Sequence, residues 1–277
     1  MGEAQDELEG RGNAMLLKDK NILVTGGTHG IGRSIVEACV REGASVVFSG
    51  RDERAANDIL AEIHPPAGKV RFIRADLSDA DACYALVNDA AGHDGKLDGL
   101  VNNAGVFPPG TVTDTSVDKL DWVLSVNIRA PFLLCQRAIT YMKGGGSIVN
   151  IGSTHAQIGA PGIAAYAVSK GALRTLTSHI AYNYASMGIR ANWVTVGWVL
   201  TEGDYAAQSA RGLSDEEIRA AARQRIPSGR YQTGGEIADA VVFLLSDKAA
   251  SHTDTDMRIT GGFTPVFGAS VNKKMEV

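Results

Sequence analysis

The chain has 277 residues, 44% hydrophobic and 21% charged, so it is long and apolar enough to bury the core of an α/β domain. Its 27 basic and 31 acidic residues give a net charge of −4, which argues against a nucleic-acid or membrane-surface partner and favours a small-molecule substrate. The three scattered cysteines and six dispersed histidines form neither CxxC nor HExxH motifs, which predicts reduced thiols in a cytoplasmic protein and no metal centre.

The chain begins with a polar segment, residues 1–16, that contains several acids and lacks the apolar region of a signal peptide. We expect this segment to be a disordered tail. No run approaches the roughly 18 apolar residues of a membrane-spanning helix. We therefore predict one domain over residues 17–268, followed by a C-terminal tail over residues 269–277.

Short β-rich runs alternate with segments of helical periodicity along this domain. Such alternation predicts a single-domain, Rossmann-type α/β fold, a doubly wound parallel sheet of about seven strands with helices on both faces. The predicted strands lie within residues 21–27, 45–50, 69–76, 97–105, 146–153, 189–197 and 256–262. The predicted helices lie at residues 31–42, 53–63, 79–92, 117–142, 165–187 and 235–246.

The first predicted strand leads directly into a glycine-rich turn, "TGGTHGIG", with Gly26, Gly30 and Gly32 spaced as TGxxxGxG. Glycines at a strand-to-helix turn let the backbone approach a pyrophosphate, and the helix N-terminus favours that anion. A glycine turn alone is weak evidence, but its place between a strand and a helix favours a dinucleotide site.

The second predicted strand ends in "VVFSGRDE", where folds that select NAD place an acid against the ribose 2′-OH. Ser49 or Gly50 occupies that position, and Arg51 follows. An arginine can bind a 2′-phosphate through charge-assisted hydrogen bonds, whereas an acid would repel it. We therefore predict NADP(H) as the favoured cofactor, with NAD(H) possible if Arg51 is only a surface charge.

The stretch "AAYAVSKGA" places Tyr166 four residues before Lys170, on one face of a predicted helix. A phenol with a pKa of about 10 is a poor base at neutral pH. We expect the neighbouring ammonium to lower the pKa of Tyr166 towards a value suited to acid–base catalysis. Taken alone, Tyr166 would equally suit core packing.

The interval from residue 197 to 256 is the longest without a predicted strand, and its first part is polar and punctuated by glycine. Long excursions in compact domains are usually functional or mobile. We interpret residues 198–230 as a substrate lid of one or two short helices; a plain surface insertion is the alternative.

Five features occur in the same order as in the short-chain dehydrogenase/reductase family: the glycine turn, "NNAG", Asn127, Ser153 and "YAVSK". The chain resembles that family over residues 18–263. The resemblance implies a catalytic tetrad in which Tyr166 exchanges a proton with the substrate oxygen and Ser153 hydrogen-bonds to it. Lys170 would reach the nicotinamide ribose, and Asn127 would position a water that links Lys170 to solvent.

The resemblance also implies which residues line the cofactor cleft, and Arg51 joins them on the argument above. The predicted cofactor residues are Gly26, Thr28, Gly30, Ile31, Gly32, Arg51, Asp76, Leu77, Asn103, Ala104, Gly105, Tyr166, Lys170, Gly197, Val199 and Thr201. Substrate candidates flank the tetrad or lie in the lid, namely Val106, Phe107, His155, Gln157, Trp198 and Tyr205. A homotetramer or dimer through residues 117–142 and 165–187 is also implied, unless the apolar residues there are all intramolecular core.

Three positions depart from the family pattern. Val196 stands where a proline usually precedes Gly197, Asp254 replaces a glycine, and Thr260 replaces an acid. Three functions stay open: an NADP(H)-dependent carbonyl reductase resembling 3-oxoacyl reductases, an NAD(P)-dependent sugar or polyol dehydrogenase, and a non-catalytic cofactor sensor. The intact tetrad disfavours the third.

Overall fold

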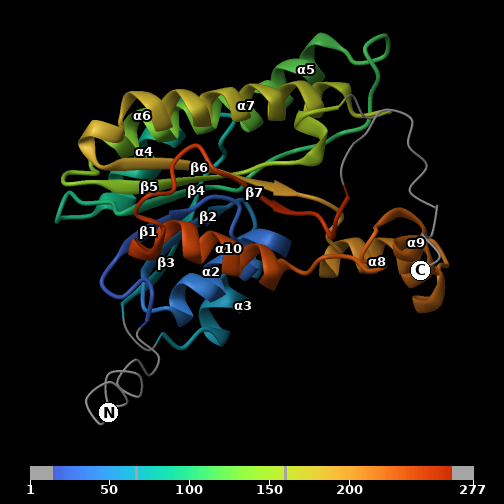
Figure 1. Cartoon of the computed structure of the whole chain (residues 1–277), viewed down its shortest axis with the longest axis horizontal. Helices are drawn as coiled ribbons and strands as arrows, with labels where there is room; N and C mark the ends of the chain where they lie inside the picture. The colour runs from blue at the N-terminus through green and yellow to red at the C-terminus, as the bar shows by residue number, and fades with distance from the viewer. Residues whose placement is uncertain (1–14, 66–67, 159–160, 264–277) are drawn as a thin grey trace, which may run out of the picture.

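A seven-stranded parallel sheet runs through the computed structural model, which describes residues 15–65, 68–158 and 161–263 (Figure 1). The strand order is β3-β2-β1-β4-β5-β6-β7, and every neighbouring pair is parallel. The predicted Rossmann-type α/β fold is therefore confirmed. The strands are β1 (Asn21–Val24), β2 (Ser45–Gly50), β3 (Val70–Arg74), β4 (Gly99–Asn102), β5 (Gly146–Ile151), β6 (Ile189–Val196) and β7 (Asp256–Ile259).

Helices cover both faces of this sheet: α2, α3 and α10 lie on one face, and α4, α6 and α7 on the other (Figure 1). The helices are α2 (Gly30–Arg41), α3 (Glu53–Glu62), α4 (Ala80–Ala91), α5 (Val117–Leu124), α6 (Ala130–Ile139), α7 (Ala164–Asn183), α8 (Glu202–Ala210), α9 (Asp215–Arg225) and α10 (Gly234–Leu245). The predicted helix at 117–142 is divided by a π-helical turn, Ser125–Arg129, and the predicted lid holds α8 and α9.

Two hydrophobic cores flank the sheet, because successive strand residues point to opposite faces. In β1, Ile22 and Val24 pack in the core formed with α2 and α10, whereas Leu23 packs in the core formed with α4 and α6. All three are fully buried, which explains why this strand is a continuous apolar run.

The strand order changes direction between β1 and β4, since the chain moves outward through β2 and β3 before it returns to β4. Ligands of open α/β sheets bind in the crevice that this switch creates at the carboxyl ends of the strands. The fold therefore brings the ends of β1, β2, β4, β5 and β6 to one site.

The N-terminal boundary of the domain is anchored at Leu16, whose main-chain N–H donates to the Glu42 carboxylate at 3.0 Å. The rest of the predicted tail, residues 1–14, and the predicted C-terminal tail at 269–277 lie outside the described residues. Within the described ranges, no helix is long and apolar enough to cross a membrane, and no cluster of His, Cys, Asp or Glu could hold a metal ion.

Candidate active site

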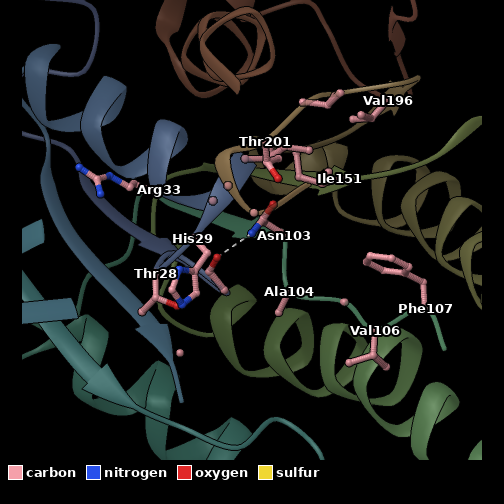
Figure 2. A pocket seen from close by; sticks show the side chains of 18 of the residues that line it. Thr28, His29, Arg33, Asn103, Ala104, Val106, Phe107, Ile151, Val196 and Thr201 are labelled. Atoms are coloured by element: carbon pink, nitrogen blue, oxygen red, sulfur yellow. Dashed lines mark hydrogen bonds between the residues drawn. The ribbon is translucent and has the colours of Figure 1, made fainter. Parts of the chain in front are cut away.

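A cavity of about 1050 Å³ lies at the carboxyl ends of the strands (Figure 2). Its walls come from the glycine turn after β1, the ends of β2 and β4–β6, helix α7 and the first residues of α8. Every residue predicted to bind the cofactor lines this cavity, as do Val106, Phe107, Ser153, His155 and Trp198.

The glycine turn packs tightly against its own backbone just before α2. Gly26 and Gly30 have positive φ angles of 64° and 53°, which favour glycine. A Cβ atom on Gly32 would lie 2.0 Å from the Gly26 carbonyl oxygen. The Asn103 amide fixes the turn by donating to the carbonyl oxygens of Thr25 and Gly26 at 2.9 and 3.0 Å. This is the form of cradle that a pyrophosphate needs.

Polar groups that could contact a ligand lie at the ends of β2 and β3. Ser49 is buried, and its Oγ atom has no hydrogen-bond partner among the described residues. Buried hydroxyls are normally hydrogen-bonded, so this atom suits a ligand. Arg51, two residues after Ser49, is exposed. Asp76 follows β3 and accepts hydrogen bonds from the main-chain N–H and the hydroxyl of Ser78, which lower the pKa of the Asp76 carboxyl. Together with the glycine cradle, these groups fit a dinucleotide.

His29 and Asp52 also line this end of the cavity, and the sequence analysis did not select them. His29 Nε2 lies 3.1 Å from the Asp52 carboxylate, which also accepts from the Ala55 N–H at 3.0 Å and so caps α3. Their positions in the sequence could have identified them, because His29 lies inside the glycine motif and Asp52 directly follows Arg51.

Tyr166 and Lys170 extend from successive turns of α7, with the Lys170 Nζ atom 5.7 Å from the centre of the Tyr166 ring. Lys170 is buried and donates to the Ile151 carbonyl oxygen at 2.7 Å. Burial lowers the pKa of Lys170 to about 8.

The expectation that Lys170 lowers the pKa of Tyr166 is wrong for this structure. Burial of the phenol raises its pKa, and a hydrogen bond with Ser153 opposes that shift only in part. The physical reason is that desolvation disfavours the phenolate form of Tyr166. Burial also disfavours the charged form of Lys170, which was expected to stabilise the phenolate.

Ser153 caps the short 3-10 turn Thr154–Ala156 that follows β5. Its Oγ atom accepts from the His155 main-chain N–H at 3.1 Å, and the His155 Nδ1 atom lies 3.3 Å from the same oxygen. The His155 and Tyr166 rings meet edge to face with centroids 6.4 Å apart. Burial lowers the pKa of His155 and thus favours its neutral form.

Asn127 lies in the π-helical turn between α5 and α6, and its side chain is fully buried. Its amide accepts from the Val106 N–H and donates to the Val106 carbonyl oxygen, both at 2.8 Å, and donates to Ser169 Oγ at 3.0 Å. Asn127 thus joins the loop after β4 to α7. Both donors are committed, so the water-positioning role stays a prediction that depends on remaining acceptor capacity.

The structure does not bring two of the substrate candidates to the cavity: Gln157 and Tyr205 are not among the residues that line it. The Gln157 Oε1 atom accepts from Arg258 at 3.2 Å, and the Tyr205 hydroxyl bonds to Asp215 at the start of α9. Both predictions relied on closeness in sequence to Ser153 or to the lid, and the side chains instead pair with neighbouring elements.

Phe107 and Trp198 do lie in the cavity wall, where Phe107 meets the Tyr166 ring edge to face at 6.0 Å. The Trp198 ring stacks under the guanidinium of Arg225, whose Cζ atom lies 5.6 Å from the ring centre. The substrate end of the cavity is therefore largely aromatic.

The main chain directly before Ser153 makes a close contact that the sequence analysis missed. A Cβ atom on Gly152 would lie 2.1 Å from the indole of Trp193, which is fully buried. The indole N–H donates to Thr195 Oγ1 at 2.7 Å. The absence of a side chain at Gly152 therefore lets the Trp193 indole pack against the main chain directly before Ser153.

The departures from the family pattern are accommodated locally. Asp254 has a positive φ of 55°, a conformation that glycine adopts more readily, and its carboxylate accepts from Arg174 and Ser178 of α7 at 2.7 and 2.8 Å. A Cβ atom on Gly197 would lie 2.8 Å from the Thr260 Cα atom, so the turn after Val196 still needs its glycine.

Comparison with known proteins agrees with this geometry. A family model described as enoyl-(acyl carrier protein) reductase matches residues 26–264. A 2-(S)-hydroxypropyl-CoM dehydrogenase from Xanthobacter autotrophicus is 36% identical over 90% of this chain and 98% of its own length. A cyclopentanol dehydrogenase from a Comamonas species is 35% identical over 90% and 98%, respectively.

A solved structure from Beutenbergia cavernae has a TM-score of 0.81 and 32% identity, covering 90% of this chain and 98% of that one. It is described as a candidate NAD(P)-dependent gluconate 5-dehydrogenase with NADP bound at low occupancy. The chain belongs to the short-chain dehydrogenase/reductase family, as the motifs indicated. It is thus an NAD(P)-dependent oxidoreductase acting on CH–OH or C=O groups.

Proposed function

We propose that the protein transfers hydride between NADP(H) and a small or medium-sized ketone or secondary alcohol, as a carbonyl reductase. The observation that carries this proposal is one cavity of about 1050 Å³ with a glycine cradle at one end and Ser153, Tyr166 and Lys170 at the other. A nicotinamide cofactor supplies the hydride chemistry when it is bound.

The chain's own residues would orient the substrate and move the proton. Tyr166 would give its phenolic proton to the substrate oxygen during reduction and accept the hydroxyl proton during oxidation. Ser153 would hydrogen-bond to that oxygen and hold it beside the phenol. Lys170, which donates to the Ile151 carbonyl, would reach the nicotinamide ribose.

The preference for NADP(H) is supported by Arg51, which is exposed at the end of β2 beside the unpartnered Ser49 hydroxyl. An arginine there can pair with a 2′-phosphate. The Asp52 carboxylate, which would repel a phosphate, is held by His29 and by the N–H of Ala55. These contacts lower the pKa of the Asp52 carboxyl and keep it ionised, so Arg51 would have to outweigh its repulsion of a phosphate.

A secondary alcohol or ketone with an apolar body suits the wall formed by Phe107 and Trp198. The cyclopentanol dehydrogenase acts, by its name, on such a molecule. A sugar or polyol dehydrogenase is the second candidate, because a gluconate 5-dehydrogenase is among the structural neighbours. A non-catalytic cofactor sensor would have no need for the tetrad residues at the cavity.

The predicted lid at residues 198–230 would close the substrate end of the cavity, since Trp198 lies in its wall and α8 and α9 follow. A dimer or tetramer would use the α5–α7 region, where Phe132, Val168 and Tyr182 are 51%, 64% and 87% exposed. The three cysteines are buried and unpaired, which supports a reducing, cytoplasmic setting.

Parallel fluorescence titrations with NADPH and NADH test the cofactor preference. We expect the wild-type protein to bind NADPH at least about tenfold more tightly, equivalent to about 1.4 kcal/mol. Arg51→Ala should remove that preference. Arg54→Ala, a nearby change on α3 outside the cavity wall, should retain it. Equal NADH binding by the wild type would reject Arg51 as the phosphate ligand.

A substrate panel tests the reaction itself. Turnover of cyclic and acyclic ketones with NADPH, together with weak activity towards sugars, polyols and enoyl thioesters, would support the carbonyl reductase. Faster oxidation of polyols with NAD would replace it with the second candidate. A protein that binds cofactor but turns over no member of the panel would favour the sensor.

A further inference from the structure

The Ser153 hydroxyl has one proton to donate and two lone pairs to accept with. In reduction it must donate to the substrate carbonyl oxygen, which offers only acceptors. The His155 main-chain N–H, at 3.1 Å, already occupies one lone pair of Ser153 Oγ. What the imidazole of His155 does at the same oxygen therefore decides whether the serine proton is free.

The Nδ1 atom of His155 lies 3.3 Å from Ser153 Oγ, and a neutral imidazole carries a proton on one of its two nitrogens. With Nδ1 bare, it would accept the serine proton and divert that proton from the substrate. With Nδ1 protonated, it would donate to the second lone pair of Oγ. Both lone pairs would then be filled, and the serine proton would be left for the substrate oxygen.

We propose that His155 is a positioning residue whose Nδ1–H donates to Ser153 Oγ and thereby commits the serine proton to the substrate oxygen. This inference rests on the proposed function, because it assigns a role within the same catalytic site. It differs from a substrate-binding role, since His155 would act through Ser153 and would contribute to turnover more than to substrate affinity.

A further contact agrees with this arrangement. The His155 ring meets the Tyr166 ring edge to face at 6.4 Å, so its orientation is constrained beside the catalytic acid. The hydrogen bond between Ser153 and Tyr166 opposes the rise that burial causes in the pKa of the phenol, so Ser153 contacts both His155 and the catalytic acid.

Substitutions at residue 155 that differ in donor capacity test the proposal. The Asn side chain of His155→Asn can place an N–H donor near the position of Nδ1, whereas that of His155→Asp is similar in size but only accepts when ionised. We expect His155→Ala to lower kcat by about tenfold or more, with NADPH binding unchanged. His155→Asn should recover most of this loss, and His155→Asp should not. His93→Ala, at an exposed histidine outside the cavity, is the matched control and should behave as wild type.

A second readout needs no turnover. The ionisation of Tyr166, followed as the ultraviolet difference from Tyr166→Phe, should move to higher pH in His155→Asp, whose carboxylate accepts the serine proton, but not in His155→Asn. The proposal is overturned if Asp restores activity as well as Asn does, or if His155→Ala raises KM with kcat unchanged. A wild-type protein without activity would instead reject the proposed function, and the Tyr166 titration would still decide the role of His155.

Discussion

The two ends of the cavity are built in different ways. At the nucleotide end the backbone makes the site: a Cβ on Gly32 would lie 2.0 Å from a carbonyl oxygen, and Asn103 bonds to two carbonyls of the turn. At the substrate end exposed side chains make it, since Phe107 is 67% and Trp198 36% exposed. The nucleotide end tolerates few substitutions because its backbone atoms are already in contact. The substrate end has exposed side chains that can accommodate different ligands.

This difference suggests that the nucleotide end and the tetrad determine the reaction, whereas the proposed lid at residues 198–230 selects the substrate. The division is consistent with relatives of about 35% identity that act, by their names, on a coenzyme M derivative and on cyclopentanol. Four substitutions test the division, each at a position where it predicts a distinct outcome.

Tyr166→Phe should have the largest effect, because it removes the proton donor while keeping the ring that packs against Phe107 and His155. We expect kcat to fall about a thousandfold, within the range for loss of a general acid. NADPH binding should be unchanged in a fluorescence titration. Retained turnover would mean that another group carries the proton, and weakened cofactor binding would mean that the two ends are not separable.

Gly32→Ala should damage the nucleotide end alone. The added methyl group meets backbone and cannot be relieved by a side-chain rotation, so we expect strain of about 1–3 kcal/mol. NADPH binding should weaken by about tenfold to a hundredfold, measured by titration. Gly203→Ala, in the cavity wall at the start of α8, is the control: the nearest atom to its Cβ lies 3.9 Å away, and binding should be unaffected. Comparable losses in both variants would contradict the proposed difference in tolerance.

Lys170 lies where the two ends meet, and its burial predicts a pH-dependent stability. Its pKa falls from 10.5 in the unfolded chain to about 8 in the folded protein, so the unfolded state binds more protons between these values. The contribution of Lys170 to the free energy of unfolding is therefore lowest below pH 8 and rises with pH towards 10.5. Lys170→Met removes this titration.

Urea unfolding of the wild type and Lys170→Met at pH 7 and pH 9.5 measures this contribution. The free energy of unfolding of the wild type relative to the variant should rise by about 2 kcal/mol between the two pH values. A constant difference would mean that the ammonium is solvated in the folded protein and does not experience the burial seen beside Ile151.

The predictability of the two ends from sequence follows the same division. The glycine cradle and the Tyr166–Lys170 pair are set within a few residues of chain, so local spacing predicted their place correctly. Gln157 and Tyr205 lie outside the cavity because they pair with Arg258 and Asp215, which lie in elements whose approach depends on tertiary packing. The Gly152–Trp193 contact joins residues about 40 positions apart, which no local pattern encodes. The pKa of Tyr166 was predicted in the wrong direction because the extent of burial is a tertiary property.

Trp198→Ala should have the smallest effect and should be confined to the substrate end. The indole contributes wall area and a stacked Arg225, an exposed cation–π contact worth about 0.5–1 kcal/mol. We expect KM for the preferred ketone to rise severalfold, with NADPH binding unchanged. Arg225→Ala keeps the indole and removes only its stacking partner, so its effect on KM should be smaller. If Trp198→Ala weakens NADPH and substrate binding equally, the lid serves both ends of the cavity, and substrate selection cannot be assigned to the lid alone.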